Sequence, residues 1–508
     1  MFIKVASGAV LGVDGYIVDV EVDLSNGLPG FEIVGLPDSA VKESRERVRA
    51  AIRNVGFSFP IKRITVNLAP ADIRKSGPAF DLPIAVGILI CTGVLTPEAV
   101  DGAFFAGELS LDGILRPVSG ILPMVLAAKA DGMKKIYVSA ENAKEAALVG
   151  DVAVYPIETI TDLVEHFSAK PISTLSMNIA EMFGTTENTY DIDFADVAGQ
   201  NLVKRALEVA AAGYHNALMI GPPGAGKTML ARRMPTILPD LSLAESMEIT
   251  KLYSIAGLLT QKNLLMTRRP FRTPHHTASY ISLAGGGRTP MPGEMSLAHN
   301  GVLFLDELPE FQKKALETMR QPLEDGHITV TRIGGVCTYP SVFLLLATMN
   351  PCPCGYHGTD RCTCTEGEIS KYVDKISGPL LDRIDIQVEA TAVRYNEISQ
   401  KQRAAEDSAT IKERVENARA RQQRRFKNES IYFNAKMPAS MIEKHCKLGG
   451  EAADLLKQVF DSMSLSARAY HKILKIARSI ADLADNADIG EDHVAEAISY
   501  RGLDRKYW

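Results

Sequence analysis

The sequence contains no hydrophobic run long enough to cross a membrane. Its longest uncharged apolar stretch runs from Leu82 to Leu95, well short of the roughly 20 residues that a transmembrane helix needs. The N-terminal segment MFIKVASGAV also lacks the basic start and the long apolar core of a signal peptide. We therefore expect a cytoplasmic protein that has no membrane partner.

The sequence also has no excess of positive charge. The formal net charge is -5 over 508 residues, so contact with nucleic acid would need a local basic patch or an assembled ring. Cysteine is scarce as well: the chain has seven, and four of them fall in NPCPCGYHGTDRCTC, residues 350–364. Because thiols stay reduced in the cytoplasm, this cluster indicates metal or redox chemistry rather than structural disulfides.

Hydrophobic periodicity divides the chain into regions. Residues 1–168 alternate β-like runs such as GYIVDVEVDL and RITVNLAP with helical runs such as DSAVKESRERVRAAIRNVG, which predicts an α/β or α+β domain. Residues 169–191 are polar and weakly patterned, as in a linker. We expect a second α/β domain over residues 192–392 and a helical domain over residues 393–508.

A phosphate-binding loop is predicted by ALMIGPPGAGKTMLARRM, which places the pattern GxxxxGKT between an apolar strand and a helix. Glycines in such a loop let backbone N–H groups close around phosphates. Lys227 would reach the β and γ phosphates of ATP, and the hydroxyl of Thr228 would hold Mg²⁺. The other residues of the loop are Gly221, Pro222, Pro223, Gly224, Ala225 and Gly226.

Two further apolar runs end in polar residues of matching chemistry. GVLFLDEL ends in Asp306, which suits Mg²⁺, and in Glu307, which suits polarisation of an attacking water. VFLLLATMN ends in Asn350, an amide that can orient the same water. In isolation, Asn350 would be read as a turn-forming residue before Pro351, but the order and spacing of the three runs favour a catalytic role.

These three runs resemble the Walker A, Walker B and sensor 1 elements of AAA+ ATPases. GPLLDRIDI is similar to the segment that carries an arginine finger, here Arg383, and MSLSARAYHKILKIARSIADL is similar to a sensor 2 helix with Arg468. A guanidinium stabilises the charge that develops on a transferring phosphoryl group. Because a neighbouring subunit normally supplies the finger, the resemblance implies a ring, most often a hexamer. A local salt bridge for Arg383 and a solvated position for Arg468 are the alternatives.

Two insertions are similar to those of one branch of these ATPases. RPFRTPHHTASYISLAGGG and the strand-turn-strand pattern HITVTRIGGVCTYPSVF resemble the helix 2 insert and the pre-sensor 1 hairpin of magnesium chelatase I subunits and MCM helicases. Such elements face the central pore, where Arg332 would contact DNA phosphates; a solvated turn arginine is the alternative. His275 and His276 should point to opposite faces of an extended segment, which favours a structural or pore-loop role over metal binding.

The charged run ARARQQRRFK has two interpretations. Its side chains could bind phosphates, or they could form a solvated helix face or a subunit contact. The cations in question are Arg419, Arg421, Arg424, Arg425 and Lys427.

The N-terminal region resembles Lon-type protease domains, whose fold is of the ribosomal protein S5 domain 2 type. The resemblance rests on KSGPAFDLPIAVGIL and LDGILRPVSGILPMVLAAKADGMKKIYV, where Ala79 and Leu122 stand at the positions of the catalytic serine and lysine. Their side chains can neither attack a carbonyl nor accept a proton, and Ser76 and Ser119 are not at matching positions. We therefore expect a binding or assembly module instead of a protease.

From end to end, the chain resembles the YifB/ComM family of magnesium-chelatase-like ATPases. This resemblance implies an ATP-driven, hexameric DNA helicase that promotes branch migration on single-stranded or branched DNA in natural transformation and recombination. The alternative is a chelatase-type or protein-remodelling chaperone ATPase that acts on a protein partner. The chain has no DxSxS metal-adhesion segment, which disfavours the chelatase form of that alternative.

The four clustered cysteines have the spacing C-x-C-x7-C-x-C and offer four soft ligands, enough for a closed tetrahedral Zn²⁺ site. They are Cys352, Cys354, Cys362 and Cys364. With two glycines and two prolines, the loop has almost no core of its own, and a bound metal would supply order. Reduced loop thiols, a redox-sensitive pair and an iron–sulfur cluster are the alternatives.

Overall fold

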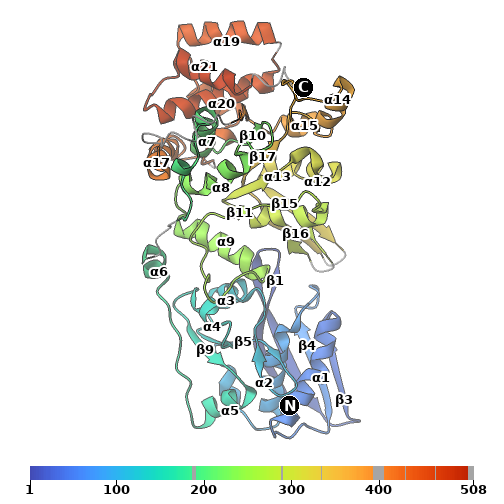
Figure 1. The fold of residues 1–508 in the computed structure, drawn as a ribbon. Helices are drawn as coiled ribbons and strands as arrows, with labels where there is room; N and C mark the ends of the chain where they lie inside the picture. The colour runs from blue at the N-terminus through green and yellow to red at the C-terminus, as the bar shows by residue number, and fades with distance from the viewer. Residues whose placement is uncertain are drawn as a thin grey trace.

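The computed structural model of the chain describes residues 1–185, 190–287, 290–332, 335–392, 406–429, 431–463 and 465–501. Figure 1 shows three tiers: an N-terminal sheet domain, a middle domain and a helical C-terminal domain. The fold is mixed α/β and contains a parallel sheet. Among the described residues, no helix combines the length and the apolar character that a membrane span requires.

The N-terminal tier is built on a seven-stranded mixed sheet with the strand order β3-β4-β2-β1-β5-β8-β9. β1 and β2 form a long antiparallel hairpin that β4 extends, whereas β5, β8 and β9 continue from β1 in parallel. Every second residue in most of β2 is buried, as the period of a strand requires. The strands are β1 Phe2–Leu11, β2 Asp14–Ser25, β3 Gly30–Val34, β4 Arg63–Ala69, β5 Ala103–Ala106, β8 Lys135–Ser139 and β9 Ala153–Ile157.

Helices cover both faces of this sheet. α1 (Ser39–Asn54) and α2 (Asp81–Cys91) share one apolar core with Val18, Val20 and Val22 of β2. α3 (Ile121–Ala130) and α4 (Ala143–Ala147) pack on the other face, where Ile17 lies. A small hairpin of β6 (Glu108–Leu109) and β7 (Leu115–Arg116) and the helix α5 (Ile160–Ser168) complete the tier.

The middle tier contains a five-stranded parallel sheet with the order β11-β14-β17-β10-β18. β10, β14 and β17 are buried along their whole length, which explains why the sequence reads there as continuous apolar runs. Successive residues serve two different cores: Leu218 and Leu345 contribute to one, Met219 and Leu346 to the other. The strands are β10 Ala217–Ile220, β11 Phe271–Arg272, β14 Val302–Leu305, β17 Leu344–Met349 and β18 Ile386–Glu389.

Helices α7 (Asn201–Gly213), α8 (Lys227–Ile237) and α9 (Leu243–Ile255) flank this sheet. Shorter elements follow in the insertions: α10 (Tyr280–Ala284), β12 (Gly285–Gly286), β13 (Met291–Pro292) and α11 (Glu294–Leu297). Beyond β14 come α12 (Lys313–Glu317) and α13 (Arg320–Asp325), and beyond β17 come α14 (Glu366–Val373) and α15 (Gly378–Leu381).

The expected strand-turn-strand segment forms an antiparallel hairpin of β15 (His327–Arg332) and β16 (Gly335–Pro340). The hairpin lies close to the N-terminal tier, because a Cβ at Gly12, in the turn between β1 and β2, would lie 3.5 Å from the carbonyl oxygen of Thr338. The turn at residues 333–334 and the side chain of Arg332 lie outside the described part of the chain, so the contact expected of Arg332 stays a prediction.

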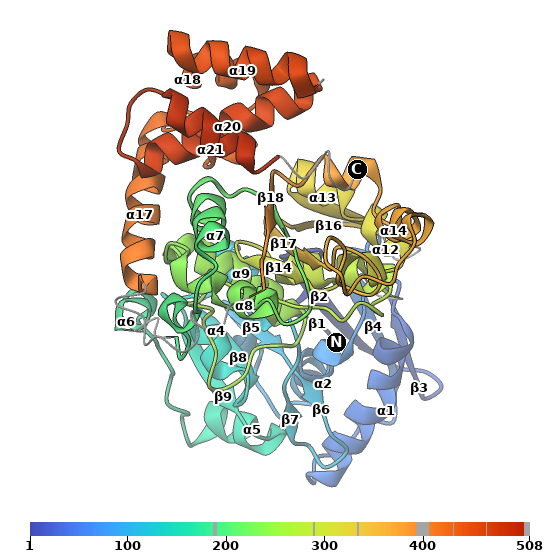
Figure 2. The ribbon, with the colours of Figure 1, turned by 45° about the horizontal axis from the view of Figure 1, so that its top comes forward.

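The segment expected to be a linker includes a short helix, α6 (Ile179–Thr185), which the sequence patterns did not predict. The C-terminal tier is helical in its described part. Residues 393–405 and 502–508, which the sequence also assigned to this helical domain, lie outside that part. Its helices are α17 Ser408–Arg425, α18 Ala439–His445, α19 Gly450–Met463, α20 Ala467–Leu483 and α21 Glu491–Ser499. Figure 2 shows α17 rising beside α7 toward the other helices of this tier.

The charged run on α17 is not one continuous solvated face. Arg419 is buried, its guanidinium lies 5.2 Å and 4.1 Å from the ring centroids of Tyr214 and Phe433, and burial lowers its pKa to about 9. Arg425 forms an ion pair with the buried Asp482 at 2.5 Å. Arg421 pairs with Asp485, while Arg424 and Lys427 are exposed. Arg419 and Arg425 therefore form contacts inside the protein, and their side chains are not available to bind phosphates.

Candidate nucleotide-binding site

The predicted phosphate loop joins the end of β10 to the start of α8, so the N-terminus of an 11-residue helix points at it. Gly224 and Gly226 have φ angles of 79° and 82°, and a Cβ at either position would meet no atom within 4 Å. Gly221 serves a different purpose, because a Cβ there would lie 2.2 Å from the carbonyl oxygen of Ala390. The loop therefore presents bare backbone on an open side, as phosphate binding requires.

Lys227 lies at the centre of the loop. Its Nζ donates to the carbonyl oxygens of Gly221 at 2.6 Å and Pro222 at 2.9 Å, and to Oδ1 of Asn350 at 3.2 Å. Burial lowers the pKa of this amine, and the nearby carboxylates of Asp306 and Glu307 oppose that shift. Lys227, the first residue of α8, and Asn350, the residue after β17, thus come together beyond the ends of the adjacent parallel strands β10 and β17.

A pair of oxygen ligands lies beside them. Thr228 Oγ1 donates to Oδ2 of Asp306 at 2.9 Å, and Thr348 of β17 donates to the other oxygen of the same carboxylate. Hydroxyl and carboxylate oxygens are the ligands that Mg²⁺ prefers. Thr348 also accepts the backbone N–H of Glu307 at 3.2 Å, so one threonine orients both acidic residues. No sequence motif drew attention to Thr348, although it lies two residues before Asn350 on the same strand.

Glu307 follows Asp306 with a left-handed backbone, φ 54°, which is uncommon for a residue with a side chain. Its side chain is 54% exposed, and Nδ1 of His276 lies 3.8 Å from its Oε2. The ring centroids of His275 and His276 are only 4.1 Å apart, so the expectation that these rings point to opposite faces was wrong. The turn that begins at residue 276 replaces the extended backbone on which that expectation depended.

Gln200, the residue before α7, also contacts the phosphate loop, although no sequence motif indicated this. Its Nε2 donates to the carbonyl oxygens of Ala225 at 3.1 Å and Thr391 at 2.6 Å, and its φ is 56°. Gln200 therefore connects the phosphate loop to the end of β18. A lone Gln after Gly199 in DVAGQ carries no signal that separates this role from an ordinary helix start.

Arg383 and Arg468 lie close together, but away from the phosphate loop. The Arg383 guanidinium contacts Glu324 and the carbonyl oxygens of Arg320 and Pro379, and Arg468 contacts Glu324 and Asp382. None of these partners belongs to the phosphate loop or to its acidic residues. The two arginines line one pocket of about 300 Å³ with three lysines, Lys436, Lys472 and Lys475.

The Lon-like positions of the N-terminal tier are apolar and buried. Ala79 and Leu122 belong to the same apolar cluster, 5% and 0% exposed. Ser76 is half-buried, and the neighbouring Lys75 is fully buried with an Nζ that has no hydrogen-bond partner in the described part of the chain. Lys75 therefore forms no hydrogen bond with Ser76.

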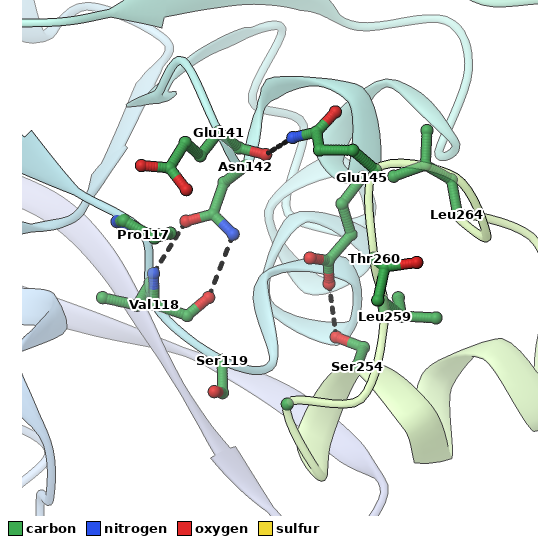
Figure 3. Close-up of a pocket in the computed structure, with 12 residues that line it drawn as sticks. Pro117, Val118, Ser119, Glu141, Asn142, Glu145, Ser254, Leu259, Thr260 and Leu264 are labelled. Carbon is green, nitrogen blue, oxygen red and sulfur yellow. Dashed lines mark hydrogen bonds between the residues drawn. The ribbon is translucent and has the colours of Figure 1, made fainter.

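Ser119 lies at a pocket of about 330 Å³ between the N-terminal and middle tiers (Figure 3). Across this junction, the hydroxyl of Ser254 from α9 donates to Glu145 of α4, and Gly120 N–H donates to the Ser254 carbonyl oxygen at 3.0 Å. Glu145 also accepts the N–H of Leu122 at 3.1 Å, and burial raises the pKa of its carboxyl. The region that matches the protease site is thus a contact between domains.

The structure also brings the side chains of the four clustered cysteines close together. Their sulfur atoms, from Cys352, Cys354, Cys362 and Cys364, all lie within 4.8 Å of one another.

Family profiles of known proteins match segments of all three tiers. The family profile "Magnesium chelatase, subunit ChlI" matches residues 193–398. The profiles "Subunit ChlI of Mg-chelatase" and "Magnesium chelatase, subunit ChlI C-terminal" match residues 20–142 and 405–501. Lon protease 2 of Bacillus subtilis is 27% identical over 136 residues, which are 26% of this chain and 24% of that protease.

Bacterial proteins, including the following two, align with almost the whole chain. Competence protein ComM of Haemophilus influenzae is 43% identical over 508 residues, 99% of this chain and 97% of that protein. YifB of Escherichia coli is 42% identical over 502 residues, 98% and 96% of the two chains. With this identity over nearly its full length, the chain belongs to the YifB/ComM family of magnesium-chelatase-like proteins.

Proposed function

We propose that the chain is a cytoplasmic ATPase that acts as a homo-hexameric DNA motor, with helicase or branch-migration activity on single-stranded or branched DNA. The observation that carries the ATPase part is the convergence of Lys227, Thr228, Asp306 and Asn350 at one edge of a parallel sheet. Lysine, hydroxyl, carboxylate and amide groups in this order are what phosphoryl transfer from a nucleoside triphosphate needs.

In this proposal, each side chain has one task. The backbone of residues 221–226 binds the phosphates, and Lys227 exchanges its bonds to the Gly221 and Pro222 carbonyl oxygens for bonds to the β and γ phosphates. Glu307 accepts a proton from the attacking water, which Asn350 orients. Thr228 and Asp306 would hold Mg²⁺, which supplies charge neutralisation on the phosphate oxygens when bound.

The hexamer is proposed because, among the described residues, the proposed finger Arg383 and the proposed sensor 2 residue Arg468 do not contact the nucleotide site of their own chain, whereas the sensor 1 residue Asn350 does. Arg383 and Arg468 have their partners at Glu324 and Asp382, so a neighbouring subunit would have to bring them to the γ phosphate. We assign the N-terminal tier as a Lon-like domain without protease activity, the middle tier as an AAA+ core and the C-terminal tier as its lid.

The DNA substrate is proposed from the family and from the name of one relative, Competence protein ComM. The hairpin of β15 and β16 is the element that we expect to contact DNA. The competing function, a chelatase-type or protein-remodelling ATPase, would use the same nucleotide site on a protein partner.

The test is steady-state ATP hydrolysis by the full chain, alone and with single-stranded or forked DNA, together with strand displacement on the fork. We expect DNA to stimulate hydrolysis and the fork to be opened. Lys227→Ala should abolish both activities, and Lys262→Ala, in an exposed loop, should leave them unchanged. An assembled hexamer that hydrolyses ATP but responds to neither DNA would favour the protein-remodelling function.

A further inference from the structure

The four thiols that meet after β17 are arranged as metal ligands. The sulfur of Cys352 lies 3.3 Å from that of Cys354 and 3.9 Å from that of Cys362, and the last two are 3.7 Å apart. Cys364 joins them, because its sulfur accepts the N–H of Cys354 at 3.4 Å. All four sulfurs are within 4.8 Å of one another.

These distances separate a metal site from disulfide bonds. A disulfide would bring two sulfurs to about 2.0 Å, and all four cysteines are free thiols. Tetrahedral Zn²⁺ with Zn–S bonds of about 2.3 Å puts its sulfur ligands about 3.8 Å apart. The separations of the sulfurs of Cys352, Cys354 and Cys362 lie near that value, from 3.3 to 3.9 Å. Four thiolates without oxygen or nitrogen ligands select zinc among the common divalent ions.

The loop that carries the thiols packs its cysteines against an apolar core of the middle tier but has no regular secondary structure of its own. No helix or strand lies between Met349, where β17 ends, and Glu366, where α14 begins. Its backbone bonds are local, such as Gly355 N–H to the Cys352 carbonyl oxygen and Cys362 N–H to that of Thr359. Of the four cysteines, only Cys352 is fully buried. A bound ion would therefore tie the two halves of the loop together.

The loop also touches the nucleotide site. Gly355 has a φ of 84°, and a Cβ there would lie 2.6 Å from Cδ of Pro223 in the phosphate loop and 3.9 Å from Cγ of Asn350. Asn350, whose Oδ1 accepts the Lys227 amine, is only two residues before Cys352. The position of the cysteine loop thus constrains both the phosphate loop and the amide expected to orient water.

We propose that Cys352, Cys354, Cys362 and Cys364 bind one Zn²⁺ per chain, and that the metal-held loop positions Pro223 and Asn350 for nucleotide binding. Each thiol gives up its proton when it ligates the ion. The zinc assignment stands independently of the ATPase, whereas the effect on nucleotide rests on the function proposed above.

The first test is the metal content of the full-length chain purified without chelator. Elemental analysis should find about one zinc per chain in a colourless protein. Cys354→Ser and Cys362→Ser should lose it, and Cys91→Ser, a half-buried cysteine outside the cluster, should keep it. If the serine variants fail to fold, Co²⁺ added to the metal-free wild-type chain should produce cobalt–thiolate absorption. A chain that neither contains zinc nor takes up Zn²⁺ or Co²⁺, or one that contains coloured iron, would overturn the assignment.

The second test compares Gly355→Ala with Gly358→Ala. Both glycines have left-handed backbones, φ 84° and 83°, so an alanine strains both equally. Only Gly355 meets Pro223, because a Cβ at Gly358 has no atom within 4 Å. We expect Gly355→Ala to weaken binding of a fluorescent ATP analogue about 5-fold or more relative to Gly358→Ala, with zinc retained in both.

Equal nucleotide affinities of the two glycine variants would refute the positioning role and leave the zinc assignment intact. A wild-type chain that contains zinc but binds no ATP analogue would instead count against the proposed ATPase and against the positioning role that rests on it.

Discussion

Arg383 and Arg468 contact the same oxygen atom, Oε1 of Glu324, at 2.5 Å and 2.7 Å. Arg383 lies in the segment after α15, and Arg468 lies on α20, 85 residues further along the chain. Glu324 lies on α13. α13 leads directly into the hairpin of β15 and β16, since it ends at Asp325 and β15 begins at His327. One carboxylate therefore links the two proposed phosphate-sensing arginines to the hairpin expected to contact DNA.

Removing Arg383, the proposed finger, should slow hydrolysis without weakening nucleotide binding. Arg383→Ala is expected to lower kcat about 1000-fold or more, because a guanidinium that acts on the transition state contributes on that scale. Affinity for an ATP analogue should stay at the wild-type value, since the partners of Arg383 lie away from the phosphate loop. Arg320→Ala, which removes an ion pair with Glu317, is the control. Unchanged kcat would exclude Arg383 as the finger.

Neutralising Glu324 should raise kcat, whereas removing Arg383 should lower it. Glu324→Gln keeps a hydrogen-bond acceptor but removes the charge that occupies Arg383 and Arg468, so we expect basal kcat to rise about 2- to 5-fold. That range corresponds to about 0.5–1 kcal/mol, the contribution of a partly exposed ion pair. Glu317→Gln is the matched control. A fall in kcat would show that Glu324 positions the arginines instead of restraining them.

Glu307 should be needed for hydrolysis but not for binding. Glu307→Gln removes the group expected to accept the proton of the attacking water, and kcat should fall about 100- to 10,000-fold. Binding of the ATP analogue should persist, because Lys227 and Thr228 are untouched. The control is Glu310→Gln, which breaks only the exposed ion pair with Lys375. Single-turnover measurements of phosphate release distinguish the two steps.

Glu145 at the domain junction should make stability depend on pH. Burial raises the pKa of its carboxyl above the ordinary value of 4.5, so the folded chain binds this proton more tightly than the unfolded chain. The contribution of Glu145 to stability is therefore full at low pH and is lost as pH rises from 4.5 through the raised pKa.

Glu145→Gln should remove this loss, because the amide oxygen can still accept the Ser254 hydroxyl and the Leu122 N–H without titrating. In urea unfolding between about pH 5 and pH 8, the variant should gain stability relative to wild type as pH rises. Glu145→Ala, which loses both hydrogen bonds, should be less stable than Glu145→Gln at every pH. A constant difference between Glu145→Gln and wild type across the range would contradict the raised pKa.

Two neighbouring arginines of α17 should differ in their effect on stability. Arg425→Ala leaves Asp482, 1% exposed, without its closest ion pair and should cost about 3 kcal/mol. Arg424 is exposed, and Arg424→Ala should change the free energy of unfolding by less than about 0.5 kcal/mol. Denaturant titration of both variants measures the difference, and equal effects would show that the buried pair does not stabilise the C-terminal tier.

Much of the fold could be predicted from short-range patterns. The run DSAVKESRERVRAAIRNVG predicted a helix, and α1 spans Ser39–Asn54; HITVTRIGGVCTYPSVF predicted the hairpin of β15 and β16. These predictions succeed because strand and helix periods depend on neighbouring residues. Where a turn interrupts an extended segment, as at His276, the same reasoning fails, and α6 was missed because its sequence has little periodicity.

The phosphate loop, the ends of the apolar strands and the cysteine spacing could be recognised without the structure, because each lies within one short segment. The contacts between distant groups are known only from the folded chain: Lys227 with Asn350, 123 residues away, Arg468 with Glu324, 144 residues away, and Glu145 with Ser254 across the domain junction. Thr348 and Gln200 acquired their roles in the same way. Local conformation follows from backbone sterics and nearby side chains. Contacts between residues that are distant in the sequence follow from the burial of apolar surface. This burial packs whole helices and strands together and thereby places their polar residues next to one another.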